Sequence, residues 1–330
     1  MQDKLAVVGG GSWGTALAAL AAQNTDSVVI YAVEDDLVKS INTNHINNLF
    51  MPDMKLPDNV TAKPFSELKD LDCGRIIWSV PTQFSAKVGR DYKESFTGKN
   101  ILIATKGIEI ESGKLIVHVL RDVFDAEFAI LSGPSFAKEV AQQKPTAVSI
   151  ASKNEKDAVW WQKKLSGAYF RCYYTDDVTG VEVGGAIKNV MAIATGIADG
   201  LGFGYNARAG LITRGLTEMA RLGIALGGKP ETFMGLSGMG DLVLTCTGDL
   251  SRNRNVGLKI AEGMSLKDIT ESTNMVAEGV YTTKAAYSLA KKIGVDTPII
   301  NEVYEILYNN KDPKRSVVDL MTRPLKSEQI

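Results

Sequence analysis

The sequence predicts an α/β fold, with a doubly wound parallel sheet in the first half of the chain and an all-helical second half. The length of 330 residues suits about two domains at roughly 150 residues each. Up to about residue 175, short β-rich runs alternate with helical patterns, which is typical of a parallel sheet covered on both faces. Beyond that point only helical periodicity continues. We therefore predict domains at 1–175 and 176–330.

The strands are predicted from short apolar runs that are rich in β-branched or aromatic residues. Several of these runs end at a Gly or Pro, and the first leads into a helix of small residues at 16–22. The predicted strands are 5–8, 28–31, 75–80, 100–105, 127–131, 147–152 and 170–174. The helices of the second half are predicted from apolar residues at helical spacing. They are 181–201, 209–226, 255–262, 282–292 and 299–308.

Composition and charge exclude several classes of function. Lys and Arg number 37 against 38 Asp and Glu, so the net charge is -1, and we expect no nucleic-acid binding. No apolar run approaches the roughly 20 residues of a membrane helix, so we expect no membrane insertion. The 3 cysteines lie far apart, so neither a disulfide framework nor a metal site is expected. The chain starts in a strand-like run without a leader, from which we expect a cytoplasmic protein.

A glycine-rich turn follows the first predicted strand. Residues 9–14, Gly-Gly-Gly-Ser-Trp-Gly, match G-x-G-x-x-G between a strand and a helix, the context in which this motif binds a dinucleotide. Gly9 permits the tight turn, Gly11 lets the backbone approach a pyrophosphate, and Gly14 lets the helix and strand pack closely. The alternative is a turn selected only for tightness. We predict a Rossmann-type nucleotide-binding half.

The end of the second predicted strand bears on the choice between NAD and NADP. Glu34, Asp35 and Asp36 stand there, about twenty residues after the turn. A carboxylate accepts a hydrogen bond from a ribose 2′-OH and repels a 2′-phosphate, so NAD is slightly favoured. The alternative role for these residues is to cap the next helix.

Lys106 and Ser135 follow later predicted strands, at the edge of the sheet where ligands bind. Lys106 comes directly after an apolar strand and is followed by a glycine, so it would present a cation to the crevice. A solvated loop lysine is the alternative. Ser135 resembles a helix N-cap, which is sufficient to explain it.

Lys188 lies in a predicted helix made almost wholly of small and apolar residues. No carboxylate stands three or four positions away from it. A desolvated lysine has a lowered pKa, which suits a general acid or base. The alternative interpretations of Lys188 are a lysine that snorkels to solvent at a domain edge and a lysine in a buried ion pair. Gly184 and Gly185 are costly inside a helix, so we expect another group, such as a cofactor ring, to approach them closely.

Two further segments carry candidate site residues. Residues 237–245 read as a flexible glycine-containing segment with one carboxylate, Asp241. Ser251 is predicted to cap a helix whose first turn contains Arg252 and Asn253. The helix dipole disfavours a cation there unless an anion binds, and a phosphate is the obvious candidate. An exposed, tolerated arginine is the alternative.

The residues together resemble the bacterial NAD(P)-dependent glycerol-3-phosphate dehydrogenases, nearly end to end. The resemblance implies reversible reduction of dihydroxyacetone phosphate to sn-glycerol 3-phosphate with NAD(P)H, which supplies phospholipid synthesis, and we expect a homodimer. Val33 stands where many members carry a basic residue or His, a departure that counts against NADP. The motifs that carry the resemblance are residues 9–16, 104–107, 131–139, 184–189, 238–246 and 251–254.

The resemblance also implies roles for individual residues. Lys188 corresponds to the catalytic acid/base, acting with Asp241, Lys106 and Asn189. The implied substrate contacts are Lys106, Gly133, Ser135, Lys188, Asp241, Thr245, Ser251, Arg252 and Asn253. The implied cofactor contacts are Gly9, Gly11, Ser12, Trp13, Gly14, Val33, Lys106, Ala137, Arg252, Val276 and Glu278.

Two other functions remain open from the sequence. One is a related oxidoreductase such as a β-hydroxyacid dehydrogenase, in which the Lys and Asn that are adjacent here as Lys188 and Asn189 are usually separated. The other is a non-catalytic dinucleotide sensor, which would leave Lys188 and Arg252 unexplained. Turnover of dihydroxyacetone phosphate distinguishes both from the dehydrogenase.

Overall fold

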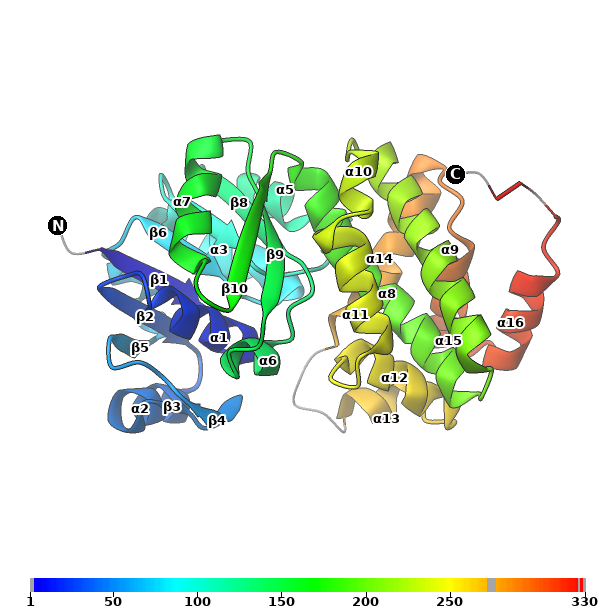
Figure 1. Ribbon diagram of the computed structural model, residues 1–330, viewed down its shortest axis with the longest axis horizontal. Helices are drawn as coiled ribbons and strands as arrows, with labels where there is room; N and C mark the ends of the chain where they lie inside the picture. The colour runs from blue at the N-terminus through cyan, green and yellow to red at the C-terminus, as the bar shows by residue number, and fades with distance from the viewer. Residues whose placement is uncertain (1–2, 272–276, 326, 329–330) are drawn as a thin grey trace. The chain divides into compact units, whose positions relative to one another are not determined.

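The computed structural model describes residues 3–271, 277–325 and 327–328. The chain forms two compact units, Met1–Thr105 with Ile116–Val178, and Lys106–Leu115 with Thr179–Ile330. The described strands belong to the first unit and the long helices to the second (Figure 1). The sequence analysis placed residues 106–115 in the first domain, whereas Ile108 and Leu115 pack into the hydrophobic core of the second unit.

The first unit is built on an eight-stranded sheet with the order β10-β9-β8-β7-β6-β1-β2-β5. From β1 the chain winds outward in both directions, so the order reverses between β1 and β6. Side chains of neighbouring strands, such as Val7, Ile77, Leu102 and Leu131, are fully buried and form the core. The strands are β1 (Lys4–Val8), β2 (Ser27–Ala32), β5 (Val60–Pro64), β6 (Arg75–Trp78), β7 (Asn100–Ile103), β8 (Glu127–Ser132), β9 (Thr146–Ala151) and β10 (Phe170–Thr175).

The sheet confirms the predicted doubly wound class and differs from it in two details. β8 and β9 pair antiparallel, and the link between them contains the five-residue helix α6 (Ala137–Ala141). β5 was not predicted, because its sequence is half polar and ends in Pro64. A proline is tolerated there because β5 is an edge strand.

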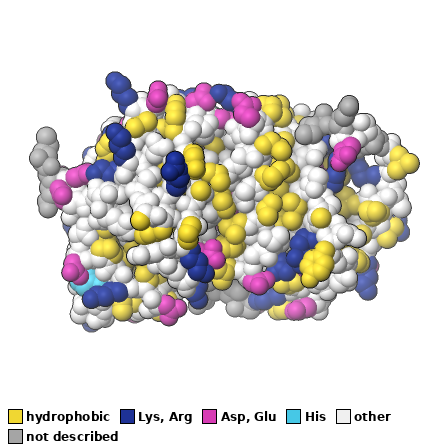
Figure 2. All heavy atoms as spheres, in the orientation of Figure 1, with side chains coloured by type: hydrophobic (Ala, Val, Ile, Leu, Met, Phe, Trp, Pro, Cys, Tyr) yellow, Lys and Arg dark blue, Asp and Glu magenta, His cyan; other side chains and the backbone are white. Residues whose placement is uncertain are grey.

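Short elements complete the first unit. A two-stranded antiparallel hairpin, β3 (Ile46–Asn47) with β4 (Met51–Lys55), follows α2 and was not predicted. The helices are α1 (Ser12–Ala21), α2 (Asp35–Asn44), α3 (Thr82–Asp91), α4 (Lys93–Phe96), α5 (Ile116–Arg121) and α7 (Glu155–Leu165), with a 3₁₀ helix η1 (Phe65–Asp70). On the face seen in Figure 2, acidic and basic side chains are interspersed, in keeping with the near-zero net charge.

The second unit contains each predicted helix. These are α8 (Val178–Gly200), α9 (Gly204–Ala225), α12 (Arg252–Ala261), α14 (Glu278–Ile293) and α15 (Pro298–Asn309). The sequence missed the shorter elements α10 (Pro230–Phe233), η2 (Leu236–Gly240), α11 (Asp241–Thr247), α13 (Leu266–Glu271) and α16 (Pro313–Met321). Residues 237–245 are therefore not a flexible segment: η2 is a π-helix that continues directly into α11.

Helix α8 is long and apolar enough to cross a membrane by length and composition alone. No continuous apolar run marks this helix in the sequence, because Glu182 and Lys188 interrupt it. In the structure the apolar window of α8 is 100% buried within the protein. Val183, Ile187 and Val190 pack in the core of the helical unit, as expected for a central helix of a globular bundle.

Candidate active site

The glycine turn lies at the point where the strand order reverses. Gly9 follows β1 with φ +114°, a conformation that favours glycine, and an added Cβ would lie 2.6 Å from the carbonyl oxygen of Ser79, just after β6. An added Cβ on Gly14 would lie 2.0 Å from the Gly9 oxygen. At Gly11, the N-cap of α1, no described atom beyond its neighbours lies within 4 Å of an added Cβ. A side chain at Gly9 or Gly14 would therefore clash with the backbone, whereas the space beside Gly11 is open for a phosphate to approach.

Two side chains at the start of α1 border this turn. The Ser12 hydroxyl donates to the carbonyl oxygen of Phe50 at 3.1 Å. The Trp13 indole Nε1 is buried and has no hydrogen-bond partner among the described residues. A buried donor of this kind is rare unless a ligand or water satisfies it. The turn, the helix N-terminus and this donor fit a dinucleotide.

The end of β2 is exposed. Val33 is 70% exposed, and Glu34 is the N-cap of α2, although within the described chain its side chain makes no capping hydrogen bond. Asp35 and Asp36 lie in the first turn of α2, exposed to solvent. The structure is therefore compatible with both interpretations of these carboxylates. They lie at the N-terminus of α2, where the helix dipole stabilises negative charge, and they also lie where a ribose would be recognised.

Gly133, Ser135 and Ala137 follow β8. Gly133 has φ +147°, and an added Cβ would lie 2.8 Å from the Cα of Val148, so only glycine fits. The Ser135 hydroxyl donates to the Gly133 carbonyl oxygen at 2.9 Å. Ser135 is not the predicted N-cap, because α6 begins at Ala137 and its N-cap is Phe136. The chain bends at Gly133 before the helix starts, which moves Ser135 out of the capping position.

Lys188, Asp241 and Lys106 form a buried cluster in the helical unit. Lys188 Nζ on α8 donates to Asp241 Oδ1 at 2.5 Å and to Thr245 Oγ1 at 3.0 Å. Lys106 Nζ donates to the other carboxylate oxygen, Oδ2, at 2.6 Å. Lys188 is 7% exposed and Asp241 1%. The structure therefore brings together four residues that the sequence named separately, and Lys188 takes part in the buried ion pair that was one of the alternatives.

The electrostatics of the cluster set the protonation states. Burial lowers the pKa of Lys188 from 10.5 to about 8, although Asp241 acts in the opposite direction. Burial would raise the pKa of Asp241, but the charges of Lys106 and Lys188 outweigh it and hold that pKa below its usual value. One ionised carboxylate thus faces two ammonium groups, and Lys188 is an acid strong enough to give up a proton near neutral pH.

Gly184 explains how Asp241 reaches Lys188. An added Cβ on Gly184 would lie 2.4 Å from the carbonyl oxygen of Ser237 in η2. At Gly184 the predicted close approach is therefore made by the protein backbone. Because η2 lies against α8 one turn before Lys188, the first residue of α11, Asp241, faces the lysine.

The start of α12 confirms the predicted cap. Ser251 Oγ accepts from the Arg254 N–H at 3.2 Å, and Arg252 in the first turn is exposed. Asn253 Nδ2 donates to Asn189 Oδ1 at 2.9 Å, and the Gly279 N–H donates to Asn253 Oδ1 at 2.9 Å. The first turn of α12 is thus hydrogen-bonded to the residue after Lys188.

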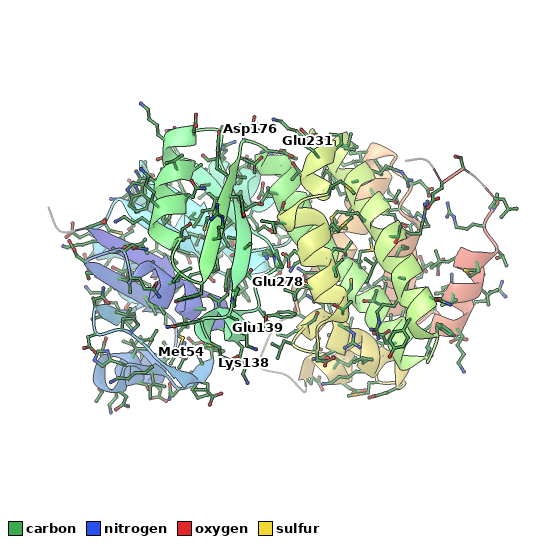
Figure 3. The ribbon with its side chains drawn as sticks, viewed as in Figure 1. Met54, Lys138, Glu139, Asp176, Glu231 and Glu278 are labelled. Atoms are coloured by element: carbon green, nitrogen blue, oxygen red, sulfur yellow. The ribbon has the colours of Figure 1, made fainter. Side chains whose placement is uncertain are left out.

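Three further residues of the helical unit bear on the candidate site, namely Glu278, Val276 and Arg254. Glu278, labelled in Figure 3, is the first residue of α14, next to Gly279. Val276 lies outside the described residues. Sequence reasoning missed Arg254, which is buried and binds Asp199. The available signal was the second arginine of residues 251–254.

Comparison with known proteins identifies the family. The family model described as "NAD-dependent glycerol-3-phosphate dehydrogenase N-terminus" matches residues 4–158, and the corresponding C-terminus model matches residues 177–318. A protein named glycerol-3-phosphate dehydrogenase (NAD(P)+) from Citrifermentans bemidjiense is 48% identical over 335 residues, covering 100% of both chains. One from Solidesulfovibrio magneticus is 50% identical over 329 residues, covering 98% of this chain and 100% of the relative.

A solved structure agrees with these matches. The crystal structure of glycerol-3-phosphate dehydrogenase from Coxiella burnetii has a TM-score of 0.92 to this chain at 39% identity, covering 98% of this chain and 99% of the other. The similarity extends over the sheet, the glycine turn and the helices that carry the lysine cluster. The chain belongs to the NAD-dependent glycerol-3-phosphate dehydrogenase family.

Proposed function

We propose that this chain reversibly reduces dihydroxyacetone phosphate to sn-glycerol 3-phosphate with NAD(P)H. The observation that carries the proposal is the buried Lys188–Asp241–Lys106 cluster in a member of this family. A ketone reduction needs a proton for the oxygen that becomes an alkoxide, and a lysine with a pKa of about 8 is suited to give it.

Lys188 is the proposed general acid. Asp241 and Thr245 hold its ammonium group at 2.5 Å and 3.0 Å, so that its position is fixed before the reaction. Lys106 and Asn189 are the proposed partners of the substrate oxygen, where a cation and an amide stabilise developing negative charge. Asp241 stays ionised and keeps both lysines in place.

The start of α12 is the proposed phosphate site. The N–H groups of the first helical residues, Arg252 and Asn253, have no intrahelical acceptor, and the helix dipole favours an anion there. The exposed Arg252 guanidinium adds a paired donor. Gly133 and Ser135, which belong to the first unit, are also proposed as substrate contacts.

The glycine turn is the proposed cofactor site. Gly9, Gly11, Ser12, Trp13 and Gly14 would hold the dinucleotide. The proposal extends to Val33, Lys106, Ala137, Arg252, Val276 and Glu278. The cofactor supplies a hydride when it is bound. The exposed carboxylates that follow Val33 favour NAD over NADP.

The organisation and setting of the protein are part of the same proposal. We assign dinucleotide binding to residues 1–175 and substrate binding to residues 176–330, with 106–115 contributing Lys106 to the second. We propose that the protein works as a homodimer in the cytoplasm, without membrane insertion, and that its product supplies phospholipid synthesis.

The test is an assay of NADH and NADPH oxidation in parallel with dihydroxyacetone phosphate. We expect turnover with the phosphorylated ketone, a slight preference for NADH, and much weaker turnover with dihydroxyacetone, which lacks the anion. Cofactor binding without turnover of any small ketone would instead indicate a dinucleotide sensor, and preference for a β-keto acid would indicate a β-hydroxyacid dehydrogenase.

A further inference from the structure

The two arginines at the start of α12 have different environments. Arg252 is exposed, whereas the Arg254 side chain is only 10% exposed. Arg254 Nε donates to Asp199 Oδ2 at 2.9 Å, with a second contact of its guanidinium to the same oxygen at 2.8 Å. Its remaining terminal nitrogen donates to Asp249 at 3.0 Å. The Arg254 charge is therefore paired with carboxylates of the protein itself.

Asp199 is the centre of this ion-pair network. Its side chain is 7% exposed and lies near the end of α8, the helix that also carries Lys188. Asp199 Oδ1 accepts from Arg208 Nε on α9 at 2.8 Å, and Oδ2 binds Arg254 on α12. Because Asp199 pairs with two arginines, removing one of them breaks its link to that helix but leaves the carboxylate with one compensating charge.

Glycines bring α8 and α12 into direct backbone contact beside this network. An added Cβ on Gly196 of α8 would lie 2.1 Å from the Arg254 carbonyl oxygen, and one on Gly257 of α12 would lie 2.2 Å from the Ile193 oxygen. Such contact fixes the distance between the helices, but small residues leave them able to slide or rotate. The Arg254–Asp199 pair, placed at the same level, fixes the register of α12 against α8.

We propose that Asp199 and Arg254 are positioning residues for the substrate phosphate. They lock the first turn of α12 onto α8, so that Arg252 and Asn253 stay at a fixed distance from Lys188, which lies 11 residues before Asp199 on a rigid helix. The inference rests on the proposed function, since it assumes that the start of α12 binds the phosphate. Arg254 itself does not touch the substrate.

Arg254→Met tests this, with Arg208→Met as the matched control. Both substitutions remove an arginine from Asp199, but only the first removes the ion pair between α8 and α12, and the Asn253–Asn189 hydrogen bond remains in both variants. For Arg254→Met we expect a rise in KM for dihydroxyacetone phosphate of roughly 10-fold or more, with kcat at saturation within about 3-fold of the wild type. The Kd of inorganic phosphate, measured by calorimetry, should rise in parallel. Arg208→Met should leave all three values within about 2-fold.

Arg254→Lys is the second variant, because it keeps the charge but not the paired geometry. We expect values between those of the wild type and Arg254→Met. NADH binding and thermal unfolding are measured in each variant to establish that it is folded. An unchanged phosphate Kd in folded Arg254→Met and Arg254→Lys would overturn the inference, as would an equal loss in Arg208→Met. A wild type that binds phosphate but reduces no ketone would refute the proposed function, and the phosphate Kd alone would then decide this inference.

Discussion

At the scale of single residues, the sequence singled out the members of the lysine cluster but not their contacts. Lys188 was singled out because a lysine without a helical partner is unusual in an apolar helix. Asp241 was singled out as the one carboxylate of a glycine-containing segment. Their pairing spans 53 positions and depends on η2, which no local pattern predicted. The buried arginine Arg254 was missed because burial of a charge follows from tertiary structure alone.

The lowered pKa of Lys188 predicts a pH profile. Reduction needs the protonated lysine, so its kcat/KM should fall as pH rises through about 8. Oxidation of sn-glycerol 3-phosphate needs the neutral lysine and should rise over the same range. Initial rates in both directions across this range check the prediction. Parallel profiles in the two directions would contradict the assignment of Lys188.

Arg252→Ala should weaken phosphate capture. In the proposed phosphate site the exposed guanidinium at the start of α12 would supply a charge-assisted pair of hydrogen bonds, whose loss should raise KM for dihydroxyacetone phosphate by roughly 10- to 100-fold. The KM for dihydroxyacetone, which has no phosphate, should not change and is the internal control. An unchanged KM for the phosphorylated substrate would remove Arg252 from the site.

At the scale of helices and strands, prediction succeeded where a segment was long and periodic. The long helices α8, α9 and α14 were identified from apolar spacing, and the strands from β-rich runs. Prediction failed at α10, η2 and α11, which are short, and η2 also contains glycines. Gly238 in η2 serves close packing, because an added Cβ there would lie 2.1 Å from the Phe233 carbonyl oxygen. A glycine-containing segment is predicted as a turn, although here the same residues form a packed π-helix.

Glu218 joins two helices and predicts a pH-dependent stability. This buried side chain on α9 accepts hydrogen bonds from the N–H groups of Ile299 (2.7 Å) and Ile300 (3.2 Å), at the start of α15. Burial raises the pKa of Glu218 from 4.5 to about 7, against the effect of those hydrogen bonds, with Asp296 raising it further and Arg221 lowering it. Between these pKa values the native state binds more protons than the unfolded state, so the Glu218 contribution to stability falls as pH rises.

Glu218→Gln should remove this dependence. Between about pH 5 and about pH 8, the free energy of unfolding of the wild type should fall relative to that of Glu218→Gln by on the order of 1–3 kcal/mol. Urea unfolding at both pH values measures the difference. Glu231→Gln is the control, because Glu231 is an exposed glutamate on α10 (Figure 3). A constant difference between wild type and Glu218→Gln would show that Glu218 does not titrate in this range.

At the scale of the whole molecule, the fold class and the order of its two halves were predictable from the sequence. Alternation of strands and helices predicted the doubly wound sheet, and its loss predicted the helical unit. That residues 106–115 belong to the helical unit was not predictable, because they follow a strand of the sheet directly and no change of composition marks the boundary at Lys106. Strand β9 was predicted, but its antiparallel direction was not, since the direction of a strand depends on its connection and not on its own residues.

The function proposed here requires both units: a cofactor held by the glycine turn of the first and a proton held by Lys188 of the second. The most direct test is the turnover of Lys188→Ala at saturating dihydroxyacetone phosphate, alongside a measurement of NADH binding. We predict that kcat falls by at least roughly 100-fold while the Kd of NADH stays within about 2-fold of the wild type. Near-normal turnover in this variant would contradict the account.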